Sequence, residues 1–331
     1  MHDQGRPLSS GVAIVTFNGL KYLPQQLESI TSQSRQLVHI VISDDRSTDG
    51  TWDYLQTWAA SSPIPVTLLR NEKQLGLSGN VEQAIKSVEA DLIFTSDQDD
   101  VWVADKVKTV AAIFESDAQI QLVHTDAILV DADGIDLGTR LFSALELSHG
   151  ELETIRSGNA FQLYCRRNVV TGATTAFRRS LLDIALPLSP TFVHDAWLAF
   201  LASATGKVHL LEAPLIAYRQ HGSNLIGAKK LSRSAKLRRL WWDMNRPTAL
   251  RLQLEQAESR HATLHARLSQ YPEVSSIWKA HIADALEFAQ QRRQLPRNRL
   301  RRFARVLARS GQYAIFSYEP KTDMLRDIVG R

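Results

Sequence analysis

The chain has 331 residues, of which 44% are hydrophobic and 22% charged, a globular composition with room for one large domain or two ordinary ones. Its single cysteine, Cys165, excludes a disulfide framework and a multi-cysteine metal site, and is consistent with a reducing compartment. The net charge of +4 is unevenly divided: residues 227–331 hold 22 Lys and Arg against 9 Asp and Glu, a balance of +13, which leaves −9 for residues 1–226. Such an asymmetry suggests two functions in one chain.

The first hundred residues alternate short apolar runs with amphipathic segments. The runs at 12–17, 39–45, 65–71 and 91–97 predict strands. Between them, apolar residues recur at helical spacing: Leu23, Leu27 and Ile30; Trp52, Leu55 and Trp58; Val81, Ile85 and Val88. Continuous apolar strands separated by helices indicate βαβ units and a mostly parallel sheet covered on both faces. Ligands of such sheets bind at the carboxyl ends of the strands.

Polar residues gather at these predicted strand ends, and they are Thr16, Asn18, Asp44, Asp45, Asn71, Asp97, Asp99 and Asp100. The stretch "SDQDDVW" (96–102) places three carboxylates within four positions. Their mutual repulsion disfavours this arrangement unless water, a cation or hydrogen-bond donors compensate. A hard divalent cation, Mg²⁺ or Mn²⁺, would neutralise them and keep positions open for phosphate oxygens. The alternative is a solvated acidic turn before the next helix.

Two common phosphate-binding motifs are absent from the sequence. No G-x-G-x-x-G follows the first predicted strand, and G-x-x-x-x-G-K-[ST] does not occur, which argues against dinucleotide-binding and P-loop proteins. The stretch "GLSGN" (76–80) is either a turn with Ser78 or Asn80 as a helix N-cap, or a substrate contact.

Several stretches together resemble a known family. "VAIVTFNGLKYLPQQLESITSQ", "VISDDRSTDGT", "NEKQLGLSGNVEQAI" and "SDQDDVW" are similar, in order and spacing, to the nucleotide-sugar half of the family-2 glycosyltransferases with the GT-A fold. "LVHTDAILVDADG", "VTGATTAFRRSLL", "HDAW" and "YRQHGSN" resemble its rhamnosyltransferase-like branch. Arg46 stands where most relatives have Gly, His194-Asp195 replaces a Glu-Asp pair, and the Q-x-x-R-W box is absent. The resemblance implies a Rossmann-like GT-A catalytic domain in residues 1–226, followed by a basic α-helical extension in 227–331.

The resemblance also implies which residues bind the donor and the metal. It places Asp99 on Mn²⁺ or Mg²⁺, with His221 as a further ligand and Asp97 toward the ribose or the metal. The donor-binding residues that it implies are Thr16, Asn18 and Asp45 for base and ribose, Asp44 for a pyrimidine ring, Asn80 for a substrate contact and Arg219 for the diphosphate. The alternatives stay open: His221 as a structural histidine in a tight turn, and Asp44 or Asp45 as a cap of the "STDGT" turn.

Asp195 is the predicted general base. With His194 it stands at the start of a predicted helix, where a carboxylate could instead simply stabilise the helix dipole. The resemblance and the apolar neighbours Val193 and Trp197, which would raise its pKa, favour the base. A base opposite the leaving group implies inversion. The branch implies transfer of L-rhamnose from dTDP-rhamnose to a saccharide or lipid-linked acceptor of a bacterial surface polysaccharide, with a UDP-hexose donor as the alternative.

The C-terminal part contains two basic amphipathic segments, 228–244 and 298–309. In the second, Leu300, Phe303, Ala304 and Leu307 share one helical face and five arginines lie off it. Such segments suit an anionic membrane surface, or else pack on the catalytic domain and leave a solvated basic face. Between them runs a heptad seam that predicts either a helical hairpin with 277–290 or a homodimer contact: Leu250, Leu254, Ala257, His261, Leu264 and Leu268.

Other classes of protein fit the sequence less well. A nucleic-acid binder would want regular aromatic platforms, and a nucleotidyltransferase a Gly- and Lys/Arg-rich loop after the first strand; neither is present. A non-catalytic membrane-associated adaptor of the polysaccharide machinery would not need the carboxylates. No run approaches about 18 consecutive apolar residues, and "MHDQGRPLSSG" has no apolar signal core. We therefore expect a cytoplasmic enzyme, peripheral at most on the inner face of the membrane.

Overall fold

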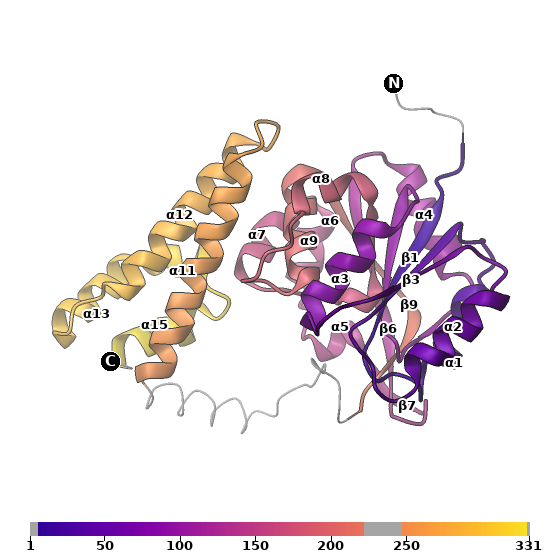
Figure 1. Ribbon diagram of the computed structural model, residues 1–331. Coiled ribbons are helices and arrows are strands. Elements are labelled where there is room, and N and C mark those ends of the chain that lie inside the picture. The colour runs from indigo at the N-terminus through magenta and orange to yellow at the C-terminus, as the bar shows by residue number, and fades with distance from the viewer. Residues whose placement is uncertain (1–5, 222–246, 330–331) are drawn as a thin grey trace. The chain divides into compact units, whose positions relative to one another are not determined.

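The computed structural model describes residues 6–221 and 247–329, which fall into two compact units (Figure 1). The described residues of the first unit are 6–160 and 169–221. Those of the second, the helical unit, are 161–168 and 247–329. The helical unit therefore contains a short segment from the middle of the first unit's sequence, which the predicted division at residue 227 does not anticipate. The basic segment 228–244 lies outside the described residues.

The first unit is built on a nine-stranded sheet in the order β3-β2-β1-β4-β8-β6-β9-β5, with β7 paired to β6. Its strands are β1 (Ser10–Thr16), β2 (His39–Asp44), β3 (Val66–Arg70), β4 (Leu92–Ser96), β5 (Val101–Trp102), β6 (Ile120–Val130), β7 (Asp136–Arg140), β8 (Thr175–Arg178) and β9 (Lys207–Arg219). The strands β1 to β4 are the four predicted from the sequence, and all their pairings with one another are parallel. Beyond β4 the sheet is mixed, because β8 runs antiparallel to both of its neighbours, β4 and β6.

The helices of the first unit follow the predicted alternation. They are α1 (Leu23–Thr31), α2 (Thr51–Ser61), α3 (Gly76–Ser87), α4 (Lys106–Ser116), α5 (Leu141–Ala144), α6 (His149–Arg156), α8 (Leu182–Ala185) and α9 (His194–Thr205), with 3-10 turns η1 (Gly172–Thr174) and η2 (Arg179–Leu181). The predicted apolar stripes of α1 and α3 are buried. In α2 only Leu55 of the predicted stripe is buried, while Trp52 and Trp58 are half-exposed. The predicted α/β fold with a helical extension is confirmed.

The second unit is all helical. Its helices are α7 (Ala160–Arg166), α11 (Pro247–Ser269), α12 (Ser276–Arg293), α13 (Arg299–Ala308), α14 (Ser310–Phe316) and α15 (Pro320–Val329). Helices α11 and α12 lie side by side as the predicted hairpin (Figure 1). Leucines of the heptad seam are buried in it, namely Leu250, Leu254, Leu264 and Leu268. No helix among the described residues is both long enough and apolar enough to span a bilayer.

Helix α7 is part of this unit because of its aromatic contacts. Phe161 is fully buried and stacks on Trp278 of α12, with ring centroids 4.4 Å apart. Its ring also meets the edge of His281. A second cluster, formed by Phe288, Leu295, Val306 and Tyr313, joins α12 to α13 and α14. Burial of these rings supplies the apolar area that a unit of this size needs to stay folded.

Candidate active site

The carboxyl ends of β1, β2 and β4 lie next to one another. Thr16 is in register with Asp44, and Ile14 with Ser96, the residue that precedes the acidic stretch. The predicted polar strand ends are therefore brought to one edge of the sheet. Gln98, which stands between Asp97 and Asp99, joins the acidic stretch to the end of β1. Its Oε1 accepts hydrogen bonds from the Thr16 hydroxyl and the Phe17 amide, both at 2.8 Å.

The hydrogen bonds of Gln98 require a glycine at position 19. A Cβ on residue 19 would lie 2.1 Å from Oε1 of Gln98, so a larger side chain would push Gln98 away from the end of β1. Thr16 is buried and its hydroxyl is already bound to Gln98. Thr16 thus positions Gln98 rather than presenting a free hydroxyl.

The acidic stretch after β4 has an unusual electrostatic environment. Burial and the neighbouring carboxylates Asp99 and Asp195 raise the pKa of Asp97 to about 7. Burial, with Asp99 and Asp97, also raises the pKa of Asp100 well above its usual value. The fully buried Lys106 lies among them, and burial lowers its pKa to about 7. Negative charge is therefore poorly compensated here, and added positive charge at the surface of the cluster would be stabilised.

Asp99 and His221 lie together on the open side of this cluster. His221 Nε2 is 2.7 Å from Asp99 Oδ2, across 122 positions of sequence. The imidazole stacks on the Tyr22 ring at 5.1 Å, which fixes its plane. A structural histidine would make the same two contacts, so they do not decide between the two predicted roles of His221. The structure brings the two predicted metal ligands to one place.

Their surroundings suit a divalent cation, although no group of three or more His, Cys, Asp or Glu side chains within residues 6–221 and 247–329 is arranged to hold one. Mg²⁺ and Mn²⁺ often keep one or two protein ligands and fill the other positions with water and phosphate oxygens. Asp100 Oδ2 is buried without a hydrogen-bond partner, and the pKa of nearby Asp97 is raised. Asp99 and His221, with Asp97 close by, are the residues that would hold the cation.

Arg219 does not face an open site. Its guanidinium is buried and donates to the backbone oxygens of Asp99 (2.8 Å) and Ala132 (3.1 Å) and to the Gln25 side chain (2.9 Å). It also lies over the Tyr22 ring. The predicted pairing of Arg219 with a diphosphate is not supported by this geometry, because its donors are taken by the loops that carry Asp99. Arg219 holds the acidic loop in place.

The carboxylates after β2 are also occupied. Asp44 is buried and accepts from the amide (3.0 Å) and hydroxyl of Ser47, so it caps the following turn, as the sequence left open. Asp45 accepts from the amides of Leu75 (2.7 Å) and Gly76 (2.9 Å) at the start of α3. The oxygens of both carboxylates therefore already accept hydrogen bonds from the protein, which reduces their capacity to bind a base or ribose.

Asn80 and Asn18 hold loops as well. Asn80 lies inside α3, not at its N-cap, and its Nδ2 donates to Ser43 O at 3.0 Å while its Oδ1 accepts from Asn71. The predicted N-cap role of Asn80 is therefore wrong, and its amide group links the ends of two strands. Asn18 adopts a positive φ of 50° and accepts from the Thr48 amide at 2.8 Å. Ser78 is likewise within the helix, so neither residue caps it.

Asp195 lies in the first turn of α9 and is largely buried. Its Oδ2 accepts from the Gly172 amide at 3.1 Å and its Oδ1 from the Ala196 amide at 2.5 Å. A Cβ on residue 172 would lie 2.5 Å from His194 Nε2, so a glycine is needed for this close approach. Because Asp195 contributes to the raised pKa of Asp97, the two carboxylates share one site.

The turn η1 that carries Gly172 is held from the acidic side. Lys106 Nζ donates to Ala173 O at 3.0 Å, and the Thr95 hydroxyl donates to Gly172 O at 2.6 Å. Thr95 is on β4, two residues before Asp97. The end of β4 therefore holds the acidic stretch and also the turn whose Gly172 amide donates to Asp195.

Sequence reasoning missed Lys106, Tyr22, Gln98 and Thr95. For Lys106 a signal was present: it precedes Val110 by four positions, so it falls on the apolar stripe of α4 and is predicted to be buried. Tyr22, Gln98 and Thr95 gain their roles only through partners far along the chain, which periodicity does not reveal.

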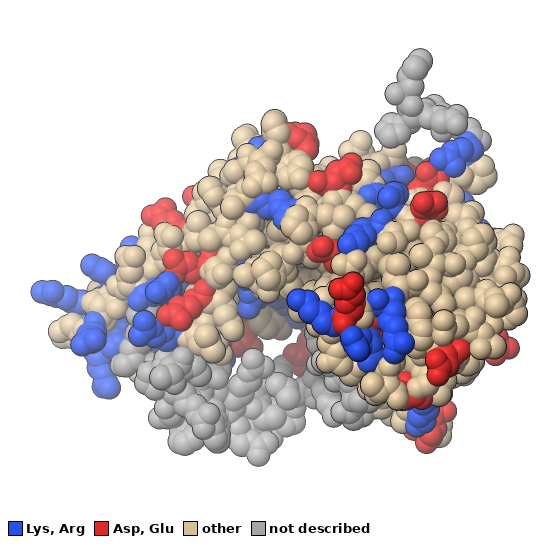
Figure 2. Space-filling view, viewed as in Figure 1, with Lys and Arg blue, Asp and Glu red and all other residues tan. Residues whose placement is uncertain are grey.

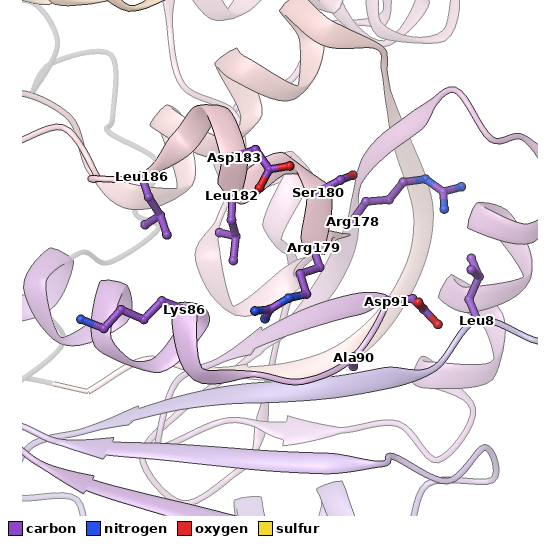
Figure 3. A pocket seen from close by; sticks show the side chains of 10 residues that line it. All are labelled: Leu8, Lys86, Ala90, Asp91, Arg178, Arg179, Ser180, Leu182, Asp183 and Leu186. Carbon is purple, nitrogen blue, oxygen red and sulfur yellow. The ribbon is translucent and has the colours of Figure 1, made fainter. Parts of the chain in front are cut away.

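A separate pocket lies at the opposite edge of the sheet (Figure 3). Leu8 and Asp91 at one end of it directly precede β1 and β4, while Lys86 lies at the other end. Its polar groups are satisfied locally: Asp91 accepts from Ser9 and Arg6, and Arg178 donates to Ile120 O and Phe114 O. Parallel α/β sheets bind ligands at carboxyl ends, and this pocket lies at the other end of the strands, away from the predicted site.

Comparisons with known sequences address the family. A family model described as glycosyl transferase family 2 matches residues 11–184. The chain is 24% identical over 217 residues to the uncharacterised glycosyltransferase alr2836 of Nostoc sp., a match that covers 64% of this chain and 65%, under two thirds, of that protein. It is 26% identical over 235 residues to the dTDP-rhamnosyl transferase RfbG of Shigella flexneri, which covers 69% of this chain and 78% of RfbG.

Comparison with solved structures addresses the fold. The crystal structure of S. aureus TarS 1–349 in complex with UDP-GlcNAc superposes with a TM-score of 0.56 at 15% identity, covering 97% of this chain and 88% of that one. The corresponding complex with UDP gives a TM-score of 0.52 at 16% identity, covering 86% and 71%. These likenesses support the fold class.

Proposed function

Because the chain belongs to glycosyl transferase family 2, we propose that it transfers a sugar from a nucleoside diphosphate to a hydroxyl group, with inversion at the anomeric carbon. The observation that carries the proposal is the convergence of Asp99 and His221, Asp97 and Asp195 on one edge of the sheet. In this reaction the charge of the diphosphate leaving group must be neutralised, the sugar must be positioned and the acceptor hydroxyl must be deprotonated.

The residues divide these tasks. A divalent cation, when bound, would neutralise charge on the departing diphosphate, and Asp99 and His221 are placed to hold it. Asp195 accepts the proton of the acceptor hydroxyl. The acceptor oxygen then forms its bond to the anomeric carbon while the bond from that carbon to the diphosphate oxygen breaks, and its electron pair leaves with the nucleoside diphosphate. Attack opposite the leaving group inverts the anomeric configuration.

For the donor we propose dTDP-L-rhamnose, and for the acceptor a saccharide or lipid-linked saccharide of a bacterial surface polysaccharide. The name of RfbG, a dTDP-rhamnosyl transferase, supports this donor. The E. coli protein WfaP, 28% identical over 198 residues that cover 58% of this chain and 69% of WfaP, is named as a UDP-Glc-dependent glucosyltransferase acting on a diphosphoundecaprenol-linked sugar. Its name supports the lipid-linked acceptor and keeps a UDP-hexose donor as the alternative.

The experiment measures binding and turnover of a donor panel containing dTDP-rhamnose and UDP-glucose, with and without Mn²⁺. Asp99→Asn should abolish the Mn²⁺-dependent part of nucleoside diphosphate affinity while the melting temperature stays near that of the wild type. Asp133→Asn, in an exposed turn, is the control and should change neither. Unchanged Mn²⁺-dependent affinity in Asp99→Asn contradicts the cation site. Turnover with UDP-sugars alone contradicts the rhamnose donor.

A further inference from the structure

Helix α13 packs into the helical unit by a face other than its predicted apolar stripe. Val306 and Arg302, one turn apart, are its buried residues. Val306 joins Phe288, Leu295 and Tyr313 in one apolar cluster. Arg302 donates through Nη2 to the backbone oxygen of Arg297 at 3.1 Å, which satisfies part of its charged head within the unit. The face that contains Val306 and Arg302 therefore anchors the helix.

The opposite face of α13 presents its apolar residues to solvent. Leu300 is 82% exposed, and Phe303 and Leu307 are each 47% exposed. Their spacing of three and four positions places them in one stripe with Ala304, which is also exposed. Amphipathic helices normally turn such a stripe toward a core. Within its own unit the stripe is therefore not packed, and a contiguous exposed apolar stripe marks a surface for binding.

The charge around this stripe is of one sign. Residues 297–309 contain six arginines and no Asp or Glu. Arg299, Arg301 and Arg305 on α13 are exposed. Figure 2 shows Lys and Arg side chains gathered where Figure 1 labels α13. Guanidinium groups bind phosphate oxygens well, so the surface suits a partner that is apolar inside and phosphate-bearing outside.

We propose that α13 lies flat in the headgroup region of a bilayer that contains anionic phospholipid. Leu300, Phe303 and Leu307 would enter the acyl boundary, and the flanking arginines would meet lipid phosphates. A second copy of this chain is a poorer occupant, because it would bring six arginines against six. A helix of ten residues, about 15 Å long, cannot cross the bilayer, so it would bind in the plane of the interface.

The inference concerns the helical unit and does not depend on the proposed sugar transfer. Point variants test it better than truncation, since removing residues after 227 would also strip Phe161 of α7 from its partner Trp278. The first variant is Leu300→Ser/Phe303→Ser/Leu307→Ser. Its control replaces three equally exposed apolar residues of other elements by Ser, namely Ile135, Leu252 and Ile277.

The second variant is Arg299→Glu/Arg301→Glu/Arg305→Glu. Its charge-matched control reverses three exposed cations elsewhere, namely Lys108, Arg140 and Lys321. Vesicle co-sedimentation is measured with phosphatidylcholine alone and with added phosphatidylglycerol, at low and high salt, and circular dichroism verifies the fold of each variant. All four variants change exposed residues only.

We expect the wild type to bind vesicles with phosphatidylglycerol and not those without it, and salt to weaken the binding. The triple-Ser variant should lower the partition coefficient by about tenfold or more. Arginine reversal should lower it by about fivefold or more per charge. Both controls should bind like the wild type. The proposal is overturned if the wild type ignores anionic vesicles, if the controls lose as much binding, or if the triple-Ser variant instead disperses a dimer that forms without lipid.

Discussion

Asp195 is the residue on which the proposed proton transfer rests. Its removal should take away a general base, a contribution of about 10²–10⁴-fold in rate, and leave the cation and donor contacts in place. We expect Asp195→Asn to reduce transfer to the acceptor by that factor with donor affinity nearly unchanged. Steady-state rates with saturating donor, together with calorimetric donor binding, measure the two effects separately.

The competing role for Asp195 is structural, through its bond from the Gly172 amide. Asparagine has one acceptor oxygen for the two amides, of Gly172 and Ala196, that Asp195 accepts, so the variant keeps one of these hydrogen bonds and should stay folded. A variant that transfers at the wild-type rate but melts several degrees lower would identify Asp195 as a helix-start residue.

Arg46 carries backbone strain. Its φ is 65°, a left-handed conformation that L residues pay about 1 kcal/mol or more to adopt and glycine adopts freely. This explains why glycine is the expected residue at this turn. Its guanidinium donates to the backbone oxygen of Glu72, which recovers part of the cost. We expect Arg46→Gly to raise the free energy of unfolding by about 1 kcal/mol in urea titration.

Asn18 is the matched control for Arg46. It also has a positive φ, of 50°, but asparagine tolerates this region, and its side chain accepts the Thr48 amide. Asn18→Gly should therefore not stabilise the protein. If Arg46→Gly is destabilising, the bond to Glu72 outweighs the relief of strain.

At the scale of elements, the helical unit depends on a buried ion pair. Arg292 Nε of α12 donates to Asp327 Oδ2 of α15 at 2.6 Å, and the Tyr313 hydroxyl of α14 donates to the same oxygen at 2.5 Å. Asp327 is fully buried. Asp327→Asn removes the nearer carboxylate partner of Arg292 and leaves only Asp323, at 3.8 Å, so we expect a loss of about 3 kcal/mol in the free energy of unfolding.

The control for this pair is Glu255→Gln. Glu255 pairs with Arg251 one turn away on the surface of α11, at 3.0 Å. Exposed pairs of this kind contribute about 0–1 kcal/mol. Chemical denaturation followed by circular dichroism compares the two variants. Equal effects would mean that Arg292 is stabilised mainly by the Phe288 and Tyr313 rings over which it lies.

The elements were predictable to the extent that they depend on local periodicity. The runs that form β1 to β4 and the stripes of α1 and α3 were identified, because burial on two faces or one leaves a readable pattern. Periodicity does not say which face of a helix is buried when both faces contain large side chains. In α13 the buried face contains Arg302, and the apolar stripe predicted from the sequence is the exposed one.

The candidate site was predictable by position more than by role. Residues at strand ends do converge, and Asp99 does meet His221. The sequence did not reveal that Asp45, Asn80 and Arg219 also bind backbone amides and carbonyls, up to 120 positions away. Such partners leave no trace in local spacing, since any residue can offer a backbone group.

At the scale of the whole molecule, a buried histidine should make stability depend on pH. Burial lowers the pKa of His124 to about 3, whereas in the unfolded chain it is about 6.5. The unfolded state therefore binds a proton that the folded state excludes. The free energy of unfolding is undiminished above pH of about 6.5 and falls as the pH drops toward about 3, by about 2 kcal/mol between pH 7 and pH 5.

Replacing the titrating group isolates its share of this dependence. His124→Leu should flatten the acid side of the profile by about that amount, measured by urea titration at a series of pH values. His149, which is exposed at the start of α6, is the control, and His149→Leu should leave the profile unchanged. An equally steep profile in His124→Leu would assign the acid sensitivity to other groups.

Helix α7 has a consequence for the integrity of the chain as a whole. A domain joined by one connection can be released by a single cut, or gained in evolution by a single fusion. Here the backbone enters the helical unit at residue 161, leaves it after 168 and returns to it later. One cut in the later connection would still leave Phe161 seated against Trp278. The two fragments should therefore co-elute after such a cut, and replacing Phe161 by a small residue should weaken their association.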